Sequence, residues 1–214
     1  MGLLNQQPES NPQIGGYIGY FGLNGWWLST FTASEREYIE DTFRPLGTEP
    51  GQGILAEGKI ASTSFTAGSL LGNLAGWFKK RPEDLDLGIR IVTKTEECAL
   101  ADEDILSLHF AYQERIQLNY RWRKENGGAL DAAISACQQQ IAISPRAADA
   151  FRSEYPGQAL PMHTGYEQLA IVLEKQGRLD EALTLCREAM ARRWAGTWED
   201  RIARATRRVR KKSR

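Results

Sequence analysis

The chain has 214 residues, which is enough for one large domain or two small domains with a buried core. Its 42% hydrophobic and 25% charged residues are typical of a globular protein. No apolar run approaches the about 18–20 residues that cross a bilayer. Residues 1–13 are polar and lack the basic and apolar parts of a secretory signal. We therefore expect a cytoplasmic protein without a membrane segment.

The formal net charge of zero conceals an uneven distribution of charge along the chain. Residues 201–214 contain eight Lys or Arg residues and no Asp or Glu, out of 27 residues of each sign in the whole chain. Residues 1–200 therefore carry 19 basic and 27 acidic side chains. The sequence thus combines an acidic body with a basic end.

Residues that usually carry catalysis or bind metals are sparse. Cys98, Cys137 and Cys186 lie far apart and fit neither a metal knuckle nor a disulfide framework, so we expect buried thiols. His109 lies on a predicted helix among mostly apolar neighbours, and His163 lies at the start of another. Metalloprotease, phosphate-loop and serine-hydrolase motifs are lacking. We expect no catalytic residue, no metal and no cofactor, and hence a protein that is not an enzyme.

The first 32 residues combine glycine, asparagine and aromatic residues without a clear period. We expect residues 1–32 to form an irregular segment that caps the first helices. The glycines at 15–19 lack the strand-then-helix setting of a dinucleotide site. Ser34 and Glu37 match a capping box, in which the two side chains satisfy free amides at a helix start. The helix that they open is expected to stop before Pro45, because the residue before proline disfavours helix.

Three further helices are expected over residues 64–79, 82–99 and 103–123. Each range carries apolar residues at spacings of three or four. Pro82 suits the first turn of its helix, and the basic residues just before it suit the end of the preceding one. No stretch shows sustained alternation of apolar and polar residues, so no sheet is expected. The predicted fold class is all-α.

A segment near the end of the chain repeats an earlier one. Residues 177–186 echo residues 128–137, with Gly, Leu, Asp, Ala and Cys in the same order. The offset of 49 residues exceeds a common repeat length of about 34, so we infer an insertion over residues 146–160. A repeated glycine turn followed by an amphipathic helix is typical of helical-repeat proteins, which usually bind other proteins.

From Met162 to Arg193 the chain resembles a tetratricopeptide repeat, a unit of about 34 residues with two antiparallel helices. Gly177 stands at the turn, where it supplies a left-handed conformation. Trp194 departs from the family, which usually has proline there, and this implies an altered exit toward the last helix. The family's packing positions are occupied by Tyr166, Leu169, Ala170, Leu173, Leu179, Ala182, Cys186 and Ala189.

The resemblance implies antiparallel helix pairs in a right-handed superhelix behind an aromatic-rich N-terminal cap. The whole chain also resembles bacterial proteins of unassigned function that join a Trp-rich N-terminal region to such repeats. The expected organisation is an N-terminal helical region over 33–100, repeats over 101–194 and a basic capping helix and tail over 195–214. An unrelated bundle of helical hairpins remains the alternative.

The resemblance further implies a protein-interaction adaptor that binds a peptide or protein in a groove lined by the first helix of each repeat. The partner itself is unknown. By position, the groove residues of the clear repeat are Thr164, Glu167, Ile171, Glu174 and Lys175. This set lacks the residues with which one variant of the family clamps chaperone tails. These positions are equally compatible with ordinary solvated or packing roles.

The basic end supports a different hypothesis. Residues 197–212 are expected to form a helix that caps the array with one polar face. Clustered positive charge also attracts nucleic acid or another anionic surface, because phosphate binding releases counterions. The candidate anion-binding residues are Arg204, Arg207, Arg208, Arg210, Lys211 and Lys212. The alternatives to the adaptor are therefore a nucleic-acid-associated protein and a self-associating structural subunit.

Overall fold

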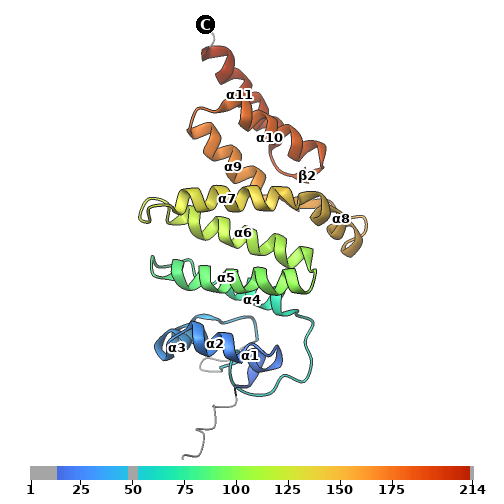
Figure 1. Ribbon diagram of the computed structural model, residues 1–214. Coiled ribbons are helices and arrows are strands. Elements are labelled where there is room, and N and C mark those ends of the chain that lie inside the picture. Colours follow the sequence, from blue (N-terminus) through green and yellow to red (C-terminus); the bar gives the residue numbers. More distant parts are fainter. Residues whose placement is uncertain (1–13, 48–52, 213–214) are drawn as a thin grey trace, which may run out of the picture. The chain divides into compact units, whose positions relative to one another are not determined.

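The computed structural model describes residues 14–47 and 53–212, apart from the side chains of Lys211 and Lys212 (Figure 1). Within these residues the chain is mostly helical, with eleven helices and one pair of short strands. The predicted all-α class is confirmed in this respect. The chain divides into two compact units, residues 1–64 and 65–214. The division falls inside the predicted helical region 33–100, which therefore contributes to both units.

Three helices lie in residues 14–47 of the first unit: α1 (Gly16–Tyr20), α2 (Asn24–Thr30) and α3 (Ala33–Thr42). The prediction of an irregular segment over residues 1–32 is thus wrong for residues 16–30, and residues 1–13 lie outside the described part. With five and seven residues, α1 and α2 are too short to show a helical period in the sequence. They are stabilised by their apolar side chains, of which Ile18 and Trp27 are buried.

The glycine-rich start of α1 is hydrogen-bonded to the loop of residues 54–58. The amides of residues 15–18 donate hydrogen bonds of 2.8–3.1 Å to carbonyl oxygens of residues 54–58. Gly16 has a φ of +55°, and a Cβ there would lie 2.5 Å from the carbonyl oxygen of Ile54. The carboxylate of Glu40 accepts the amides of Leu55 and Ala56 in turn. The glycines therefore permit close approach of backbone to backbone.

The start of α3 corrects the predicted capping box by two residues. The Thr32 side chain accepts the Glu35 amide at 3.2 Å, and the Glu35 carboxylate accepts the Thr32 amide at 2.8 Å. The expected pair, Ser34 and Glu37, lies within the first turns of the helix instead. Both pairs fit the sequence pattern, and Thr32 has the extended backbone that a capping residue needs. The helix ends before Pro45 as predicted.

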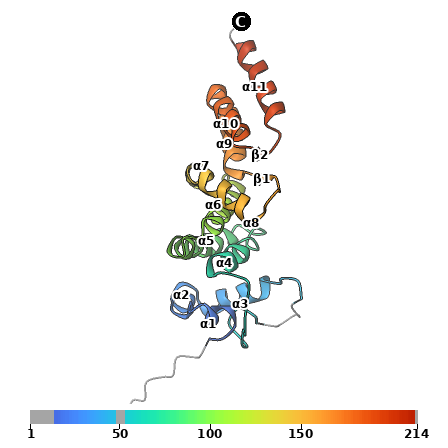
Figure 2. The ribbon, with the colours of Figure 1, turned by 90° about the vertical axis from the view of Figure 1, so that its right-hand side faces the viewer.

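The second unit is a succession of helices that pack on one another in chain order (Figures 1 and 2). Consecutive helices contact each other from α4 to α7 and from α9 to α11, and α7 also packs on α9. An extra helix, α8, is inserted between α7 and α9. The elements are α4 (Ala67–Ala75), α5 (Asp84–Ala101), α6 (Ile105–Arg121), α7 (Ala129–Ala142), α8 (Ser144–Glu154), β1 (Leu160–Met162), α9 (Thr164–Lys175), α10 (Leu179–Ala191), β2 (Trp194–Ala195) and α11 (Trp198–Lys212).

Local signals set the ends of these helices. The predicted helix over 64–79 is shorter, because Thr66 and Ser69 form a reciprocal cap at its start and Gly76 follows its last residue. The helix α8 begins two residues before the inferred insertion and covers its first part. Gly177 has a φ of +77° between α9 and α10, which confirms the predicted left-handed turn.

The strands β1 and β2 pair in parallel, with Leu160 opposite Trp194 and Met162 opposite Ala195. The absence of any sheet from the predicted fold is thus a small error. Strands of three and two residues are too short for a period of two to be visible in the sequence. The chain leaves α10 through β2, which begins at Trp194.

Small residues let the helices of this unit approach closely. Ala170, Ala182 and Ala189, predicted to pack in this way, are all buried. Ala182 lies in a cluster with Ile116 of α6 and Cys137 of α7, as well as with Leu169 and Leu173 of α9. This cluster therefore joins side chains of α6, α7, α9 and α10.

Candidate interaction surfaces

The five predicted groove residues lie on α9, but their side chains do not share one open surface. Glu167 and Glu174 face α11, where the guanidinium of Arg201 lies 3.9 Å and 2.8 Å from their carboxylates. Both carboxylates are only part-exposed, and the Arg201 side chain is buried. The last helix of the chain thus covers part of the face predicted to receive a partner.

The remaining predicted groove residues contact α6 or lie half-buried. The Thr164 hydroxyl donates to the side-chain oxygen of Gln113 at 3.2 Å. The Lys175 ammonium donates to the Tyr120 hydroxyl at 2.9 Å. Ile171 is half-buried. The structure therefore groups these residues by their intramolecular contacts with α6 and α11.

A hollow of about 300 Å³ lies between α7, α9 and α10, on a face that the groove prediction does not include. We refer to it as the α7–α9–α10 hollow. Its floor is apolar and consists of buried and half-buried side chains, namely Ile134, Leu169, Val172, Leu173 and Leu185. Its rim is polar and exposed, and comprises Gln138, Gln176, Arg178, Glu181 and Thr184.

An ion pair closes one side of this rim. The Arg178 guanidinium donates to both carboxylate oxygens of Glu181, at 2.6 Å and 2.5 Å. The hydrogen bond from Arg178 holds the pKa of Glu181 below its ordinary value. The two charges cancel at the rim, so the hollow presents an apolar floor within a border of nearly neutral polar groups.

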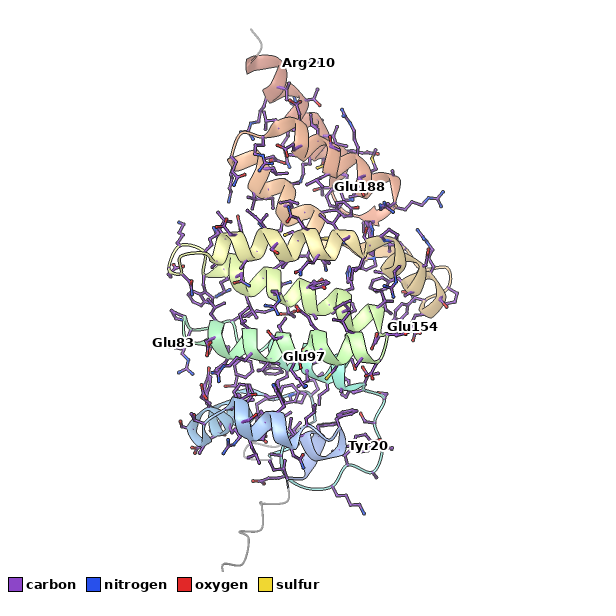
Figure 3. The ribbon with its side chains drawn as sticks, in the orientation of Figure 1. Tyr20, Glu83, Glu97, Glu154, Glu188 and Arg210 are labelled. Carbon is purple, nitrogen blue, oxygen red and sulfur yellow. The ribbon has the colours of Figure 1, made fainter. Side chains whose placement is uncertain are left out.

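The predicted anion-binding arginines are exposed along α11, and Figure 3 places Arg210 near the C-terminal end of that helix. Arg207 donates to the Ala203 carbonyl at 3.2 Å, and Arg208 donates to the Glu174 carbonyl at 3.4 Å. Among residues 14–47 and 53–212, no carboxylate forms an ion pair with any of these four arginines, Arg204, Arg207, Arg208 and Arg210. The side chains of Lys211 and Lys212 lie outside the described part.

A basic and aromatic segment at the end of α6 was missed by the sequence reasoning. Residues 120–124 read Tyr-Arg-Trp-Arg-Lys, and we refer to them as the basic–aromatic turn. The Arg123 guanidinium carbon lies 3.9 Å from the centre of the Tyr120 ring, and that of Arg121 lies 5.5 Å from the Trp122 ring. The alternation of aromatic and cationic residues was the signal that could have identified it.

The two histidines lie together in the interior of the second unit, with ring centres 5.1 Å apart. His163 caps α9, since its Nδ1 accepts the Tyr166 amide at 3.3 Å. The His109 ring stacks on Trp194 with a centre distance of 5.5 Å. Burial lowers the pKa of His109 to about 4 and that of His163 to about 3. Both rings are therefore neutral near pH 7 and serve packing and capping.

No cluster of three or more metal-ligating side chains occurs in the described part of the chain. Comparison of the chain with protein-family models, with curated proteins and with solved structures gives no match in any of the three. Among residues 14–47 and 53–212, none of the helices combines the length and the apolar composition that a bilayer crossing requires.

Proposed function

We propose that this chain is a cytoplasmic adaptor of the tetratricopeptide type, which binds a peptide segment of a protein partner. The α4–α5, α6–α7 and α9–α10 pairs are taken as its repeats and α11 as its terminal capping helix, arranged in a right-handed superhelix. The succession of contacts between neighbouring helices supports this assignment. The extra helix α8 and the strand pair are departures from the plain repeat.

The observation that carries the proposal is the α7–α9–α10 hollow. Apolar side chains form its floor, and exposed polar side chains surround them. Its volume of about 300 Å³ lies at the lower end of the about 300–1,000 Å³ that ligand sites span. A hollow of this size suits one large apolar side chain of a bound peptide, because a buried anchor within a polar border is how protein interfaces gain most of their affinity.

The rim indicates the kind of peptide. Gln138, Gln176 and Thr184 supply both donors and acceptors for the backbone of an extended segment. The Arg178–Glu181 pair leaves no net charge that would require a charged anchor. We therefore expect a segment with one aromatic or branched aliphatic anchor between polar residues.

A displayed library of peptides with one randomised apolar position tests the proposal. Selected peptides are titrated against the full chain, against Gln138→Trp and against Gln139→Trp. Both glutamines are exposed on α7, but only Gln138 lines the hollow. Filling the hollow should weaken binding at least about tenfold, because blocking an anchor costs about 1.4 kcal/mol or more. Gln139→Trp should bind like the unmodified chain.

Two results would contradict the proposal. One is a failure of the library to yield any peptide that binds the full chain. The other is equal affinity of the selected peptides for the Gln138 and Gln139 variants, which would place their binding site elsewhere.

A further inference from the structure

One cation from the turn after α6 and one from the end of α9 meet on a tyrosine in the second unit. Tyr120 lies in the last turn of α6, and the Arg123 guanidinium carbon lies 3.9 Å from the centre of the tyrosine ring. The Lys175 nitrogen, from the end of α9, lies 5.6 Å from the same centre and 2.9 Å from the hydroxyl oxygen. Lys175 and Tyr120 are 55 positions apart in the sequence, so the fold brings the second positive charge to this aromatic group.

The last helix brings further cations to this place. Arg208 of α11 donates to the carbonyl oxygen of Glu174, the residue next to Lys175. Arg204 and Arg207 precede it on the same helix and are exposed. Lys175 therefore connects the basic–aromatic turn with Arg208 of α11, and we call these residues, together with the exposed Arg204 and Arg207, the basic surface.

Acidic partners of the basic surface are absent from the described residues. In the part of the chain that the structure describes, none of Arg123, Lys175 and Arg208 forms an ion pair with a carboxylate. Arg201, which lies on α11 like Arg208, does pair with Glu174. Burial by itself would raise the pKa of Tyr120, yet the hydrogen bond from Lys175 and the charge of Arg123 hold it below its ordinary value. A concentration of unneutralised positive charge attracts anions.

Aromatic rings distinguish this surface from a merely basic one. Tyr120 and Trp122 are half-exposed and alternate with Arg121, Arg123 and Lys124. Such a combination fits single-stranded nucleic acid, whose phosphates contact cations while its bases stack on aromatic rings. An anionic membrane fits less well, because insertion requires a free apolar helix face. Trp198 and Ala205 of α11 are buried, Ile202 and Val209 are half-buried, and α11 packs on α10.

We propose that the basic surface binds single-stranded nucleic acid, with phosphates on Arg123, Lys175 and Arg208 and bases on Tyr120 and Trp122. This role is independent of the α7–α9–α10 hollow. It places the anion-binding function on α9, α11 and the turn after α6 rather than on the basic tail alone.

The first test is fluorescence anisotropy of a labelled oligothymidylate of about 20 nucleotides, which is longer than the about 4–16 nucleotides that single-strand binding modules cover. The full chain is compared with Lys175→Gln/Arg208→Gln and with Arg146→Gln/Arg187→Gln. The second pair removes two exposed arginines from α8 and α10 and is matched in charge. Circular dichroism melting verifies that both variants are folded.

The Lys175→Gln/Arg208→Gln variant should bind at least about tenfold more weakly at low salt. Its slope of log affinity against log salt concentration should be less negative by about 1.4, which is about 0.7 for each lost phosphate contact. The control pair should change the affinity less than about threefold, because its charges lie outside the basic surface. Equal weakening in the two variants would overturn the proposal, since net charge alone would then explain binding.

The second test separates base stacking from charge. An abasic strand of the same length retains the phosphates but offers nothing to stack, so it should bind at least about tenfold more weakly than oligothymidylate. Equal affinity for the abasic strand, or tighter binding of polyglutamate or of anionic vesicles, would overturn the proposal. Gln138→Trp should leave nucleic-acid binding unchanged, so failure of this proposal and failure of the peptide proposal are distinguishable.

Discussion

Arg201 of α11 and Glu174 of α9 form an ion pair of 2.8 Å, in which the side chains retain only 9% and 18% of their exposure. The pair joins the last helix to the first helix of the preceding pair. Arg201 also lies within 3.9 Å of Glu167, so one guanidinium serves two carboxylates of α9. These contacts fix α11 where it covers part of the predicted groove.

Replacement of Arg201 by methionine should lower the free energy of unfolding by about 2 kcal/mol, because a hydrogen-bonded charge pair at a part-buried site is lost and Glu174 keeps no cationic partner. Chemical denaturation measures the change. Arg204→Met is the matched control, since Arg204 is exposed on the same helix and forms no ion pair in the described part of the chain. Equal destabilisation by the two changes would show that the Arg201 pair contributes nothing specific.

Gly16→Ala should destabilise the first unit more than Gly22→Ala does. Both glycines have a positive φ, of +55° and +66°, so each change carries a backbone penalty of about 1–2 kcal/mol. At Gly16 the new Cβ would in addition meet carbonyl oxygens at 2.5 Å, whereas at Gly22 it would meet nothing within 4 Å. Hydrogen exchange of the amides of residues 15–18 measures the difference. Identical exchange in both variants would contradict the close approach.

Stability should decrease in acid through the two buried histidines. In the unfolded chain each pKa is near 6.5, whereas in the folded chain the pKa of His109 is about 4 and that of His163 about 3. The unfolded chain therefore binds more protons between these values. The histidine contribution is complete above pH 6.5 and is lost as the pH falls toward 4 and 3, by up to about 1.4 kcal/mol per pH unit for each histidine.

Denaturation between pH 4 and pH 7 measures this loss in the unmodified chain and in His109→Phe/His163→Asn. Phenylalanine keeps a ring against Trp194, and asparagine keeps a side chain that can cap α9. The double variant should therefore lose less stability on acidification. Parallel pH curves for the two proteins would assign the acid sensitivity to other groups.

In the native protein a thiol reagent should label Cys98 before the other two cysteines. Cys98 is half-buried, whereas Cys137 and Cys186 are buried. Burial raises the pKa of Cys137 to about 12 and that of Cys186 to about 11, so their reactive thiolate forms are scarce near neutral pH. Mass spectrometry of peptides after brief labelling identifies the modified residue. Early labelling of Cys137 or Cys186 would show that the helices open locally.

The sequence indicated those features of the fold that depend on local pattern. Spacings of three and four predicted the long helices, and small residues such as Ala182 predicted close packing. The short helices α1 and α2 escaped prediction, because their stability depends on contacts such as the hydrogen bonds of residues 15–18 with a distant loop. The strand pair escaped for the same reason, since it joins residues 33 and 34 positions apart in the sequence.

The candidate sites were harder to predict than the fold. Position within the predicted repeat placed the expected groove residues on α9. Only the structure reveals that Arg201 pairs with two of them, Glu167 and Glu174. The α7–α9–α10 hollow combines residues of three helices, so no single stretch of sequence contains it. Lys175 was predicted as a groove residue, and its contact with Tyr120 instead connects it to the basic surface.

The parallel pairing of β1 with β2 has a mechanical consequence. The chain enters the α9–α10 pair through β1 and leaves it through β2, so the two ends of that pair are hydrogen-bonded to each other. A stretching force along the chain pulls β1 and β2 in opposite directions and loads their hydrogen bonds in shear. The intervening helices bear no tension until those bonds break, so the strand pair acts as a clamp that shields the α9–α10 pair from force.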